Sequence, residues 1–294
     1  MSKLTKIPFE KLQVLKQMYG ADRTLNSTTV NAITNILNRI KKTPELEKRV
    51  EFLSLDDNWS RNGTILIKNE SRVYFNTLER TPYQSIRSTL DALDVEDEIT
   101  FVCISDKFRT ILHDFLWYNN LERIFEEGTS GYWMSNNDTK SLKIESLPEN
   151  YIIKPLNSNH VDEINNESPR DGGDHLNYVK NSIEHKMSVG IFDKHTNELI
   201  AWCFQMDYCS IGMGVVKSSK KRTGLGSYAV KTLLKRMAND NDMDITWHVI
   251  HGHKISHKFC HSIGGEIFDT FTWLSAKRKV IKGASRFGLY QLIY

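Results

Sequence analysis

The chain of 294 residues repeats one order of predicted secondary structure on either side of a polar stretch, Asn136 to Asn150. In each half, the spacing of apolar residues predicts two helices, three strands, and then a helix, a strand, a helix and a strand. The first half has predicted helices at 8–19, 26–41, 82–93 and 106–117, and strands at 50–55, 63–69, 72–78, 98–104 and 129–135. The second half begins with an additional strand at 151–155; its helices are predicted at 158–166, 175–185, 225–238 and 253–263, and its other strands at 188–193, 198–206, 209–216, 244–250 and 266–274. The repeat predicts two domains, at 1–140 and 150–294.

The second half contains a short strand, a basic glycine loop and a helix in direct succession, from Gly212 to Met237. Gly224 and Gly226 remove side chains where a phosphate group would approach the backbone, so the amides of Thr223 to Ser227 can point at it. The helix that begins there adds the positive end of its dipole. The loop also carries four cations, Lys217, Lys220, Lys221 and Arg222, and the helix has an apolar stripe of Leu225, Ala229, Val230, Leu233, Leu234 and Met237. This pattern predicts a site for a phosphorylated cofactor.

The loop differs from two common phosphate-binding motifs. The chain has no run of Gly, four residues, Gly, Lys and Ser or Thr, as a P-loop requires, and the loop lacks the three glycines of a Rossmann turn. The alternative interpretation is a structural loop with two turn glycines and a solvated basic run.

Composition restricts the partners and the compartment. The net charge of +3 is too small to indicate nucleic-acid binding, and the basic residues are concentrated at the loop. No apolar run approaches the roughly 18 residues of a membrane span. The four cysteines lack paired spacing, and the N-terminal stretch has no apolar signal core. We therefore expect a cytoplasmic protein with reduced thiols that binds neither nucleic acid nor membrane.

The loop from Lys221 to Gly226 resembles the acyl-CoA loop of the GNAT acyltransferase superfamily, which reads Arg or Gln, two residues, Gly, one residue, and Gly or Ala. Its first position here is Lys221, with Arg222 beside it. The repeated order of elements is also the GNAT order. The second half is similar to the glycine N-acyltransferase family and its insect relatives in the pairs Ala201-Trp202, Met206-Asp207, Gly224-Leu225, His248-Val249 and Lys258-Phe259.

The resemblance implies tandem GNAT-like domains of the α/β (α+β) class, each with a mixed, mostly antiparallel central sheet flanked by helices. The first copy is expected to be degenerate, because the segment from Glu79 to Ser85 has no glycine to admit a phosphate. The second copy is expected to bind acyl-CoA or acetyl-CoA as co-substrate, with pantetheine along the fourth strand. The implied cofactor-binding residues are Met213, Val215 and Val216 on that strand, Lys221, Arg222, Thr223, Gly224, Leu225, Gly226 and Ser227 in the loop, and His253 where the family often has Asn.

The implied reaction is transfer of an acyl group to an amine by direct attack. Glycine N-acyltransferases carry a glutamate base five residues before the first loop glycine, and this chain has Ser219 there. His248 is the substitute, because strand alternation places it opposite Trp247 and Val249 and its ordinary pKa of about 6.5 lies near working pH. Cys260 occupies the position of the tyrosine acid found in many GNAT enzymes. The alternatives are a hydrogen-bonded histidine within a sheet and a buried thiol that acts as a small hydrophobic residue.

Three further expectations concern metal, acceptor and assembly. His253, His257 and His261 share one helix face, but no carboxylate has HExxH spacing, so we expect a solvated face and no metal. The acceptor is a small amine or an amino acid, with Arg170 suited to a carboxylate, Asp171 and Asp174 suited to an amine, and Trp202 and Tyr178 as an aromatic wall or core. We expect a monomer or homodimer, and the resemblance leaves a mitochondrial location open. The alternative function is a non-catalytic GNAT module that binds acyl-CoA or a protein partner.

Overall fold

The computed structural model describes residues 3–95, 97–167, 175–206, 211–241 and 243–279. The first half contains strands β1 (Leu4–Lys6), β2 (Val50–Leu55), β3 (Ile65–Asn69), β4 (Arg72–Asn76), β5 (Glu98–Ser105) and β6 (Leu121–Met134). Its helices are α1 (Leu12–Tyr19), α2 (Ser27–Lys42), α3 (Asn58–Asn62), α4 (Gln84–Asp91) and α5 (Arg109–Tyr118), and α6 (Asn136–Ser141) follows β6.

The second half repeats this order, as predicted. Its strands are β7 (Tyr151–Lys154), β8 (Ser188–Asp193), β9 (Leu199–Phe204), β10 (Gly212–Val216), β11 (Ile245–Ile250) and β12 (Glu266–Arg278). Its helices are α7 (Val161–Glu167), α8 (His175–His185), α9 (Leu225–Asn241) and α10 (Lys254–Ser262). The predicted repeat is confirmed, and β1, α3 and α6 are short elements that the periodicity did not predict.

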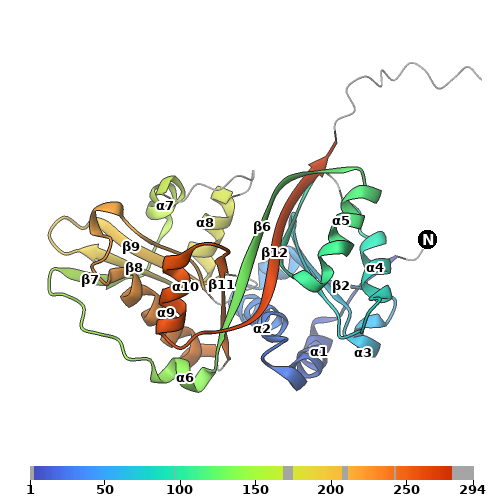
Figure 1. The fold of residues 1–294 in the computed structure, drawn as a ribbon, viewed down its shortest axis with the longest axis horizontal. Helices are drawn as coiled ribbons and strands as arrows, with labels where there is room; N and C mark the ends of the chain where they lie inside the picture. The colour runs from blue at the N-terminus through green and yellow to red at the C-terminus, as the bar shows by residue number, and fades with distance from the viewer. Residues whose placement is uncertain (1–2, 96, 168–174, 207–210, 242, 280–294) are drawn as a thin grey trace, which may run out of the picture.

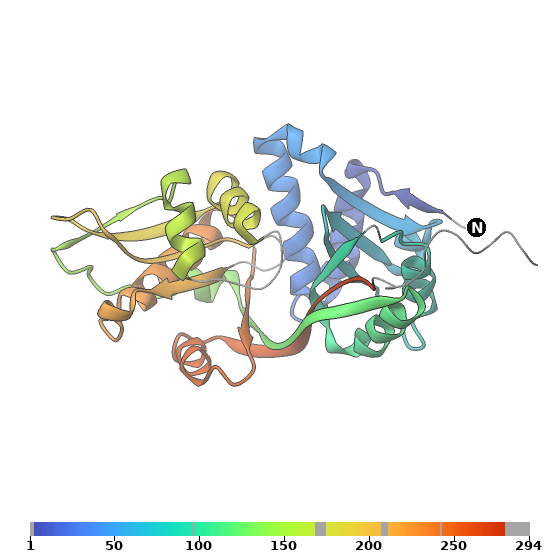
Figure 2. The same cartoon turned by 90° about the horizontal axis from the view of Figure 1, so that it is seen from above.

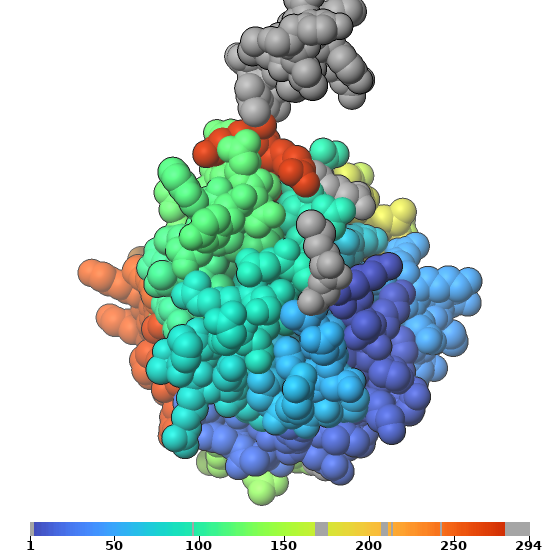
Figure 3. Space-filling model, turned by 90° about the vertical axis from the view of Figure 1, so that its right-hand side faces the viewer, coloured from blue at the N-terminus to red at the C-terminus, as the bar shows by residue number. Residues whose placement is uncertain are grey.

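The strands of the two halves are exchanged. One sheet has the order β1-β2-β3-β4-β5-β12-β6-β11, and a second has the order β10-β9-β8-β7. The last strand, β12, therefore lies between β5 and β6, while β6 of the first half pairs with β11 of the second. Figure 1 shows β6 and β12 as two long, curved strands that connect the lobes, and Figure 3 shows the red end of β12 on the face of the first half. All pairings of these strands are antiparallel.

The exchange accounts for the main departure from the predicted elements. Strand β6 begins at Leu121, eight residues before the predicted start at 129, because its extension pairs with the far end of β12, where Leu121 faces Arg278. Its first part is rich in charged residues, and burial there is low, so apolar spacing alone did not reveal a strand. The division of the chain at 140–150 stays a prediction, with the last strand lying among strands of the first half.

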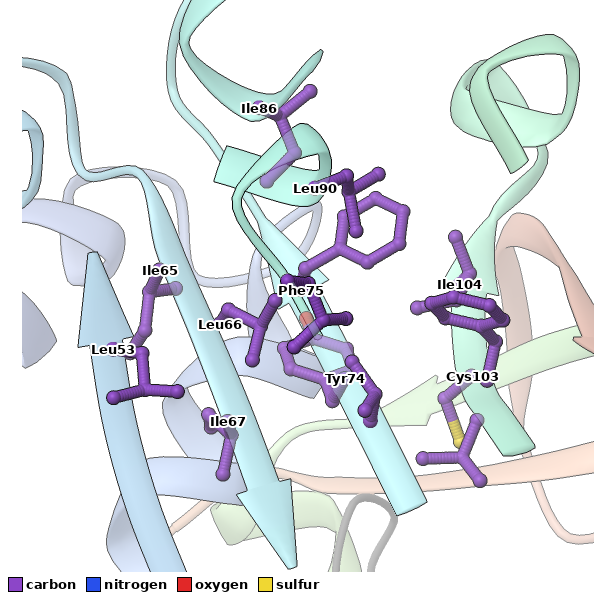
Figure 4. Close-up of a cluster of buried hydrophobic side chains, with 14 of the residues drawn as sticks. Leu53, Ile65, Leu66, Ile67, Tyr74, Phe75, Ile86, Leu90, Cys103 and Ile104 are labelled. Carbon is purple, nitrogen blue, oxygen red and sulfur yellow. The ribbon is translucent and has the colours of Figure 1, made fainter. Parts of the chain in front are cut away.

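Alternation along the strands divides the second half into two cores. Ala201 and Cys203 of β9 face α9, whose buried face includes Leu233 and Met237. Trp202 and Phe204 point to the other face and pack with residues of α7 and α8. The first half has one large core, in which strands β2 to β5 meet α4 and α5; Figure 4 shows part of it, with Ile86 and Leu90 of α4 above the sheet.

Helix α2 stands between the two lobes (Figure 2). Ten consecutive residues, from Ser27 to Ile36, are buried, although half of an isolated surface helix would face water. Its asparagines bond the second half: the Nδ2 atom of Asn31 donates to the hydroxyl of Thr246 over 3.0 Å, and Asn35 Oδ1 accepts from Gln205 Nε2 over 2.8 Å. The halves are thus joined by a polar helix face as well as by exchanged strands.

Candidate functional site

The sheet of the second half opens between β10 and β11. Strand β10 pairs with β9, and its only described link to β11 is a single parallel bridge between Ile211 and Trp247. The register on β9 shifts between Gly212 and Val215, so β10 contains a bulge at this point. Backbone groups along the open side of β10 are therefore available to an extended polar ligand. The sequence analysis predicted that pantetheine binds along this strand. Of the residues predicted to contact it, Val215 and Val216 are half-buried, and the side chain of Met213 lies outside the described residues.

The glycine loop lies at the far end of β10, where α9 begins. Gly224 has a φ of +83°, and a Cβ built on it meets no atom within 4 Å, so this glycine supplies a left-handed turn that faces open space. A Cβ on Gly226 would lie 2.7 Å from Val216 Cγ2, so the second glycine lets the helix pack against β10. Lys221, Arg222 and Thr223 are exposed, and Leu225 is buried beneath them. The loop is held in place by the buried Leu225, and its other side is open to solvent. This shape fits a phosphate group bound at the helix N-terminus.

One of the predicted loop cations is held elsewhere. Lys217 Nζ lies 2.5 Å from Glu163 Oε1 and 2.9 Å from Glu198 Oε1, and its side chain is largely buried. These carboxylates raise its pKa against the opposing effect of desolvation. The prediction that Lys217 faces the phosphate site is wrong, because α7 and the β8–β9 turn bring two acidic residues to it. Lys220, Lys221 and Arg222 remain as the cations of the loop.

His248 lies on β11, opposite Gly131 of β6. Its neighbours Trp247 and Val249 pack in the core beneath α9, so the imidazole is on the other face, as alternation predicted. The ring lies 4.5 Å from the ring of Phe271 and 6.2 Å from that of Trp273, measured between centroids. Burial lowers the pKa of His248 to about 3, so the imidazole is neutral at pH 7.

The hydrogen bonds of His248 define its tautomer. The hydroxyl of Thr129 lies 3.2 Å from Nδ1 and 3.4 Å from the carbonyl oxygen of Phe271. Because a carbonyl only accepts, Thr129 donates its proton to Phe271 and accepts from Nδ1, which must carry the hydrogen. The Nε2 atom then presents a lone pair, and it is buried with no hydrogen-bond partner among the described residues. The sequence analysis did not identify Thr129 as a partner of His248. Its only signal was the pair of glycines around it, Gly128 and Gly131, since glycines within a strand mark places where another group comes close to the backbone.

The burial of His248 predicts acid sensitivity. Below pH 6.5 the unfolded chain binds a proton at this residue and the folded protein does not, so stability falls as the pH is lowered toward the folded value of about 3. Between pH 7 and pH 5 this residue alone removes about 2 kcal/mol from the free energy of unfolding. Urea titrations at both pH values test this, with His248→Gln expected to lose that part of the dependence and the exposed His195→Gln to keep it. Equal pH dependence in wild type and His248→Gln would contradict the assignment.

Cys260 is buried on α10 and accepts a hydrogen bond of 2.9 Å from Trp247 Nε1. Burial raises its pKa to about 11, which keeps the thiol protonated at neutral pH. Both features agree with a proton donor and with a simple core residue. His253 caps α10, where its Nδ1 accepts from the amide of Ser256 over 3.4 Å, and its side chain is exposed.

The other histidines of α10 meet a tyrosine of the first half. The hydroxyl of Tyr132 lies 2.7 Å from His257 Nδ1 and 3.2 Å from His261 Nε2. His257 Nε2 donates to the carbonyl of Ile250, so its Nδ1 accepts the tyrosine proton. Within the part of the chain that the structure describes, no group of three His, Cys, Asp or Glu side chains is arranged to hold a metal ion.

The residues proposed for acceptor choice are only partly described. Arg170, Asp171 and Asp174 lie outside the described residues, as does Asp207. Trp202 and Tyr178 are both buried in the core beneath α7 and α8.

Among the described helices, none is both long and apolar enough to cross a bilayer. The cytoplasmic location stays a prediction.

In the first half, α4 occupies the place that α9 has in the second half, and a carboxylate of the chain itself lies at its N-terminus. The amide of Ser85, in the first turn of α4, donates to Glu79 Oε2 over 2.8 Å. The ring of Tyr83 packs 5.0 Å from that of Phe108, next to the same helix end. The place that a phosphate occupies at a helix N-terminus is therefore taken by a side chain of the chain itself. That the first copy is degenerate stays a prediction.

Comparison with known proteins identifies the fold. Residues 188–274 match the model of the FR47-like protein family. Among solved structures, the chain is similar to a Drosophila protein at 18% identity, over 95% of this chain and 99% of that one, with a TM-score of 0.86. It is also similar to a tandem GNAT protein from the clavulanic acid biosynthesis pathway, at 10% identity over 95% and 99% of the two chains, with a TM-score of 0.54. No curated protein sequence matches the chain. The predicted fold class, a tandem of GNAT-like units, is confirmed.

Proposed function

We propose that the protein is an acyl-CoA-dependent N-acyltransferase whose cofactor site lies in the second half. The observation that carries this proposal is that β10 and β11 part beside an exposed glycine loop at the start of α9. The FR47-like match covers the same strands, loop and helix. Acyl-CoA or acetyl-CoA would supply the acyl group as a thioester.

The residues present fit such a ligand. The amides of Thr223 to Ser227 would hold the pyrophosphate with Lys221 and Arg222, while the open edge of β10, from Met213 to Val216, would bond pantetheine. His253 is exposed at the start of α10 and is proposed to touch the cofactor. The first half would bind no second cofactor, because Glu79 fills its helix end.

His248 is proposed to accept a proton from the attacking amine. Its Nε2 lone pair is buried and unpaired among the described residues, and Thr129 holds the ring in that tautomer. A pKa of about 3 makes the imidazole a weak base, so it would take the proton only as the attacking nitrogen gains positive charge. Cys260, whose thiol keeps its proton, is the proposed acid toward the leaving thiolate.

We propose a small amine or an amino acid as acceptor, and a monomer or homodimer as the assembly. A second candidate is a non-catalytic GNAT module that binds acyl-CoA or a protein partner. The observation that favours this alternative is Ser219, which stands where the glycine N-acyltransferases have a glutamate.

An acceptor panel separates the two functions. Purified protein is mixed with acetyl-CoA or benzoyl-CoA and with glycine, arylalkylamines or polyamines, and release of free thiol is followed. Thiol release that depends on one acceptor supports the enzyme. Binding of a CoA ester by calorimetry without thiol release from any pairing supports the binding module, and failure to bind any CoA ester contradicts both.

The loop assignment predicts a specific loss of CoA binding. Gly224→Glu places a carboxylate where the phosphates should lie, and we expect CoA affinity to fall at least tenfold, about 1.4 kcal/mol. Gly264→Glu is the matched control, because that glycine also has a left-handed φ, +89°, and open space around it. Calorimetry with CoA measures both variants. Unchanged affinity in a folded Gly224→Glu protein would remove the loop from the site.

A further inference from the structure

A polar pocket lies between the two halves, and none of its lining residues belongs to the glycine loop. The first half lines it with Arg39 at the end of α2, Arg49 just before β2, and the turn that joins β3 to β4. The second half contributes Tyr178 of α8 and, one residue beyond that helix, Lys186. Figure 2 shows α2, in blue, standing beside the lobe that carries α8, in yellow. A ligand in this pocket would contact both halves.

The lining carries four cations and one carboxylate. The cations are Arg39, Arg49, Arg72 and Lys186, and the carboxylate is Glu70. Elsewhere in this protein, basic side chains form direct ion pairs with carboxylates. Arg109, for example, lies 2.7 Å from a carboxylate oxygen of Glu126. In contrast, Arg49 and Arg72 form no ion pair with any described residue. Like charges drawn together repel one another, and an anion between them removes that repulsion.

The orientation of Arg72 favours an oxyanion. Its guanidinium carbon lies 3.8 Å from the centre of the Tyr178 ring, and Lys186 Nζ lies 4.4 Å from the same centre. Tyr178 is buried, and its hydroxyl donates to the sulfur of Met206 over 3.3 Å, so the ring is a fixed platform. A guanidinium stacked on such a ring keeps its N–H edge free for two parallel bonds to a carboxylate or phosphate.

The neutral members of the lining support the same chemistry. Asn69 and Asn181 contribute side-chain amides from the two halves. Arg and Lys side chains donate hydrogen bonds and accept none, so most of the polar lining suits a ligand with many acceptor oxygens. An amine or another cation would meet repulsion from four positive charges.

We propose that this pocket binds a small oxyanion with two or more negative charges, a phosphate compound or a polycarboxylate, and that the bound anion ties the two halves together. The site is separate from the proposed cofactor site, since the two have no residue in common. The proposal does not depend on acyl transfer.

Calorimetry with simple anions tests the site. Inorganic phosphate, pyrophosphate and citrate are titrated into the full chain at matched ionic strength, with and without saturating CoA. We expect at least one of them to bind at one site per chain, and to do so equally with CoA present. Phosphate and citrate serve as the two arms that distinguish a phosphate ligand from a carboxylate ligand.

Two charge-matched double variants locate the site. Arg49→Gln with Arg72→Gln removes two pocket cations, and we expect anion affinity to fall at least tenfold while CoA affinity stays the same. Arg61→Gln with Lys277→Gln removes two exposed cations outside the pocket and should leave anion binding unchanged. Arg49→Gln alone, at an exposed position, repeats the test if the double variant does not fold. The proposal is overturned if no anion saturates, if CoA displaces the anion, or if the pocket variants bind as well as wild type.

Discussion

His248→Gln is expected to lower turnover by roughly a hundredfold or more, with CoA affinity unchanged, because general bases contribute about 10² to 10⁴ in rate. The substitution keeps a polar side chain at the position but removes the Nε2 lone pair that is buried and unpaired among the described residues. Glutamine cannot take a proton from the amine. The measurement is steady-state thiol release with the acceptor that the panel identifies, together with CoA titration by calorimetry.

Two further variants make this result specific. Thr129→Val removes the hydrogen-bond acceptor of His248 Nδ1, so the ring loses its preferred tautomer and turnover should fall by a smaller factor. Cys260→Ala tests the proposed acid in the same assay, and a lower turnover with unchanged CoA affinity is expected. His195→Gln, in the exposed turn before β9, should behave as wild type. Full activity of a folded His248→Gln protein would contradict the proposed role of His248 as the base.

Gly131→Ala is expected to destabilise the whole molecule by about 1–3 kcal/mol, the range for inserting a methyl group into a packed core. Gly131 lies on β6, opposite His248 on β11 and Asp269 on β12. A Cβ there would come within 2.3 Å of Phe271 Cε2 and 2.9 Å of Phe268 Cε1, so both rings must shift. Thermal and urea unfolding measure the loss.

The shape of the unfolding curve carries additional information. Because β6, β11 and β12 meet at Gly131 and belong to both halves, we expect the two halves of the variant to unfold together in one transition. Gly20→Ala is the control, since Gly20 has a φ of −69° and no atom within 4 Å of an added Cβ. Its stability should change little. Two separate transitions, with only one shifted, would show that the exchanged strands do not couple the halves.

The elements around the proposed cofactor site could be predicted from the sequence, because their signals are local. Helix α9 begins at Leu225, as predicted from the glycines before it and the apolar stripe along it. Strand β11, and the position of His248 on the sheet face opposite Trp247 and Val249, followed from alternation. The partner of the last strand was not accessible, because periodicity defines a strand and its faces but not which distant strand lies beside it.

Long-range contacts also changed the chemistry of individual side chains. The sequence placed Lys217 among the loop cations, and only the fold brings Glu163 and Glu198 to it. Thr129 and Phe271, which orient and bury His248, lie more than 100 residues before it and about 20 after it. The inter-half pocket has the same origin, since its cations are dispersed from Arg39 to Lys186 along the chain. These side chains are brought together by tertiary packing, which local sequence patterns do not predict.

The exchanged strands also impose an order on biosynthesis. The sheet of the first half is incomplete until β12 lies between β5 and β6, and β12 is made after every other described element. The first half therefore cannot close its sheet until β12 has been synthesised, and its β5 edge stays exposed until then. A protein of this construction reaches its native state only after its last strand has been synthesised, and neither half can be lost or replaced in evolution without a new partner for that edge.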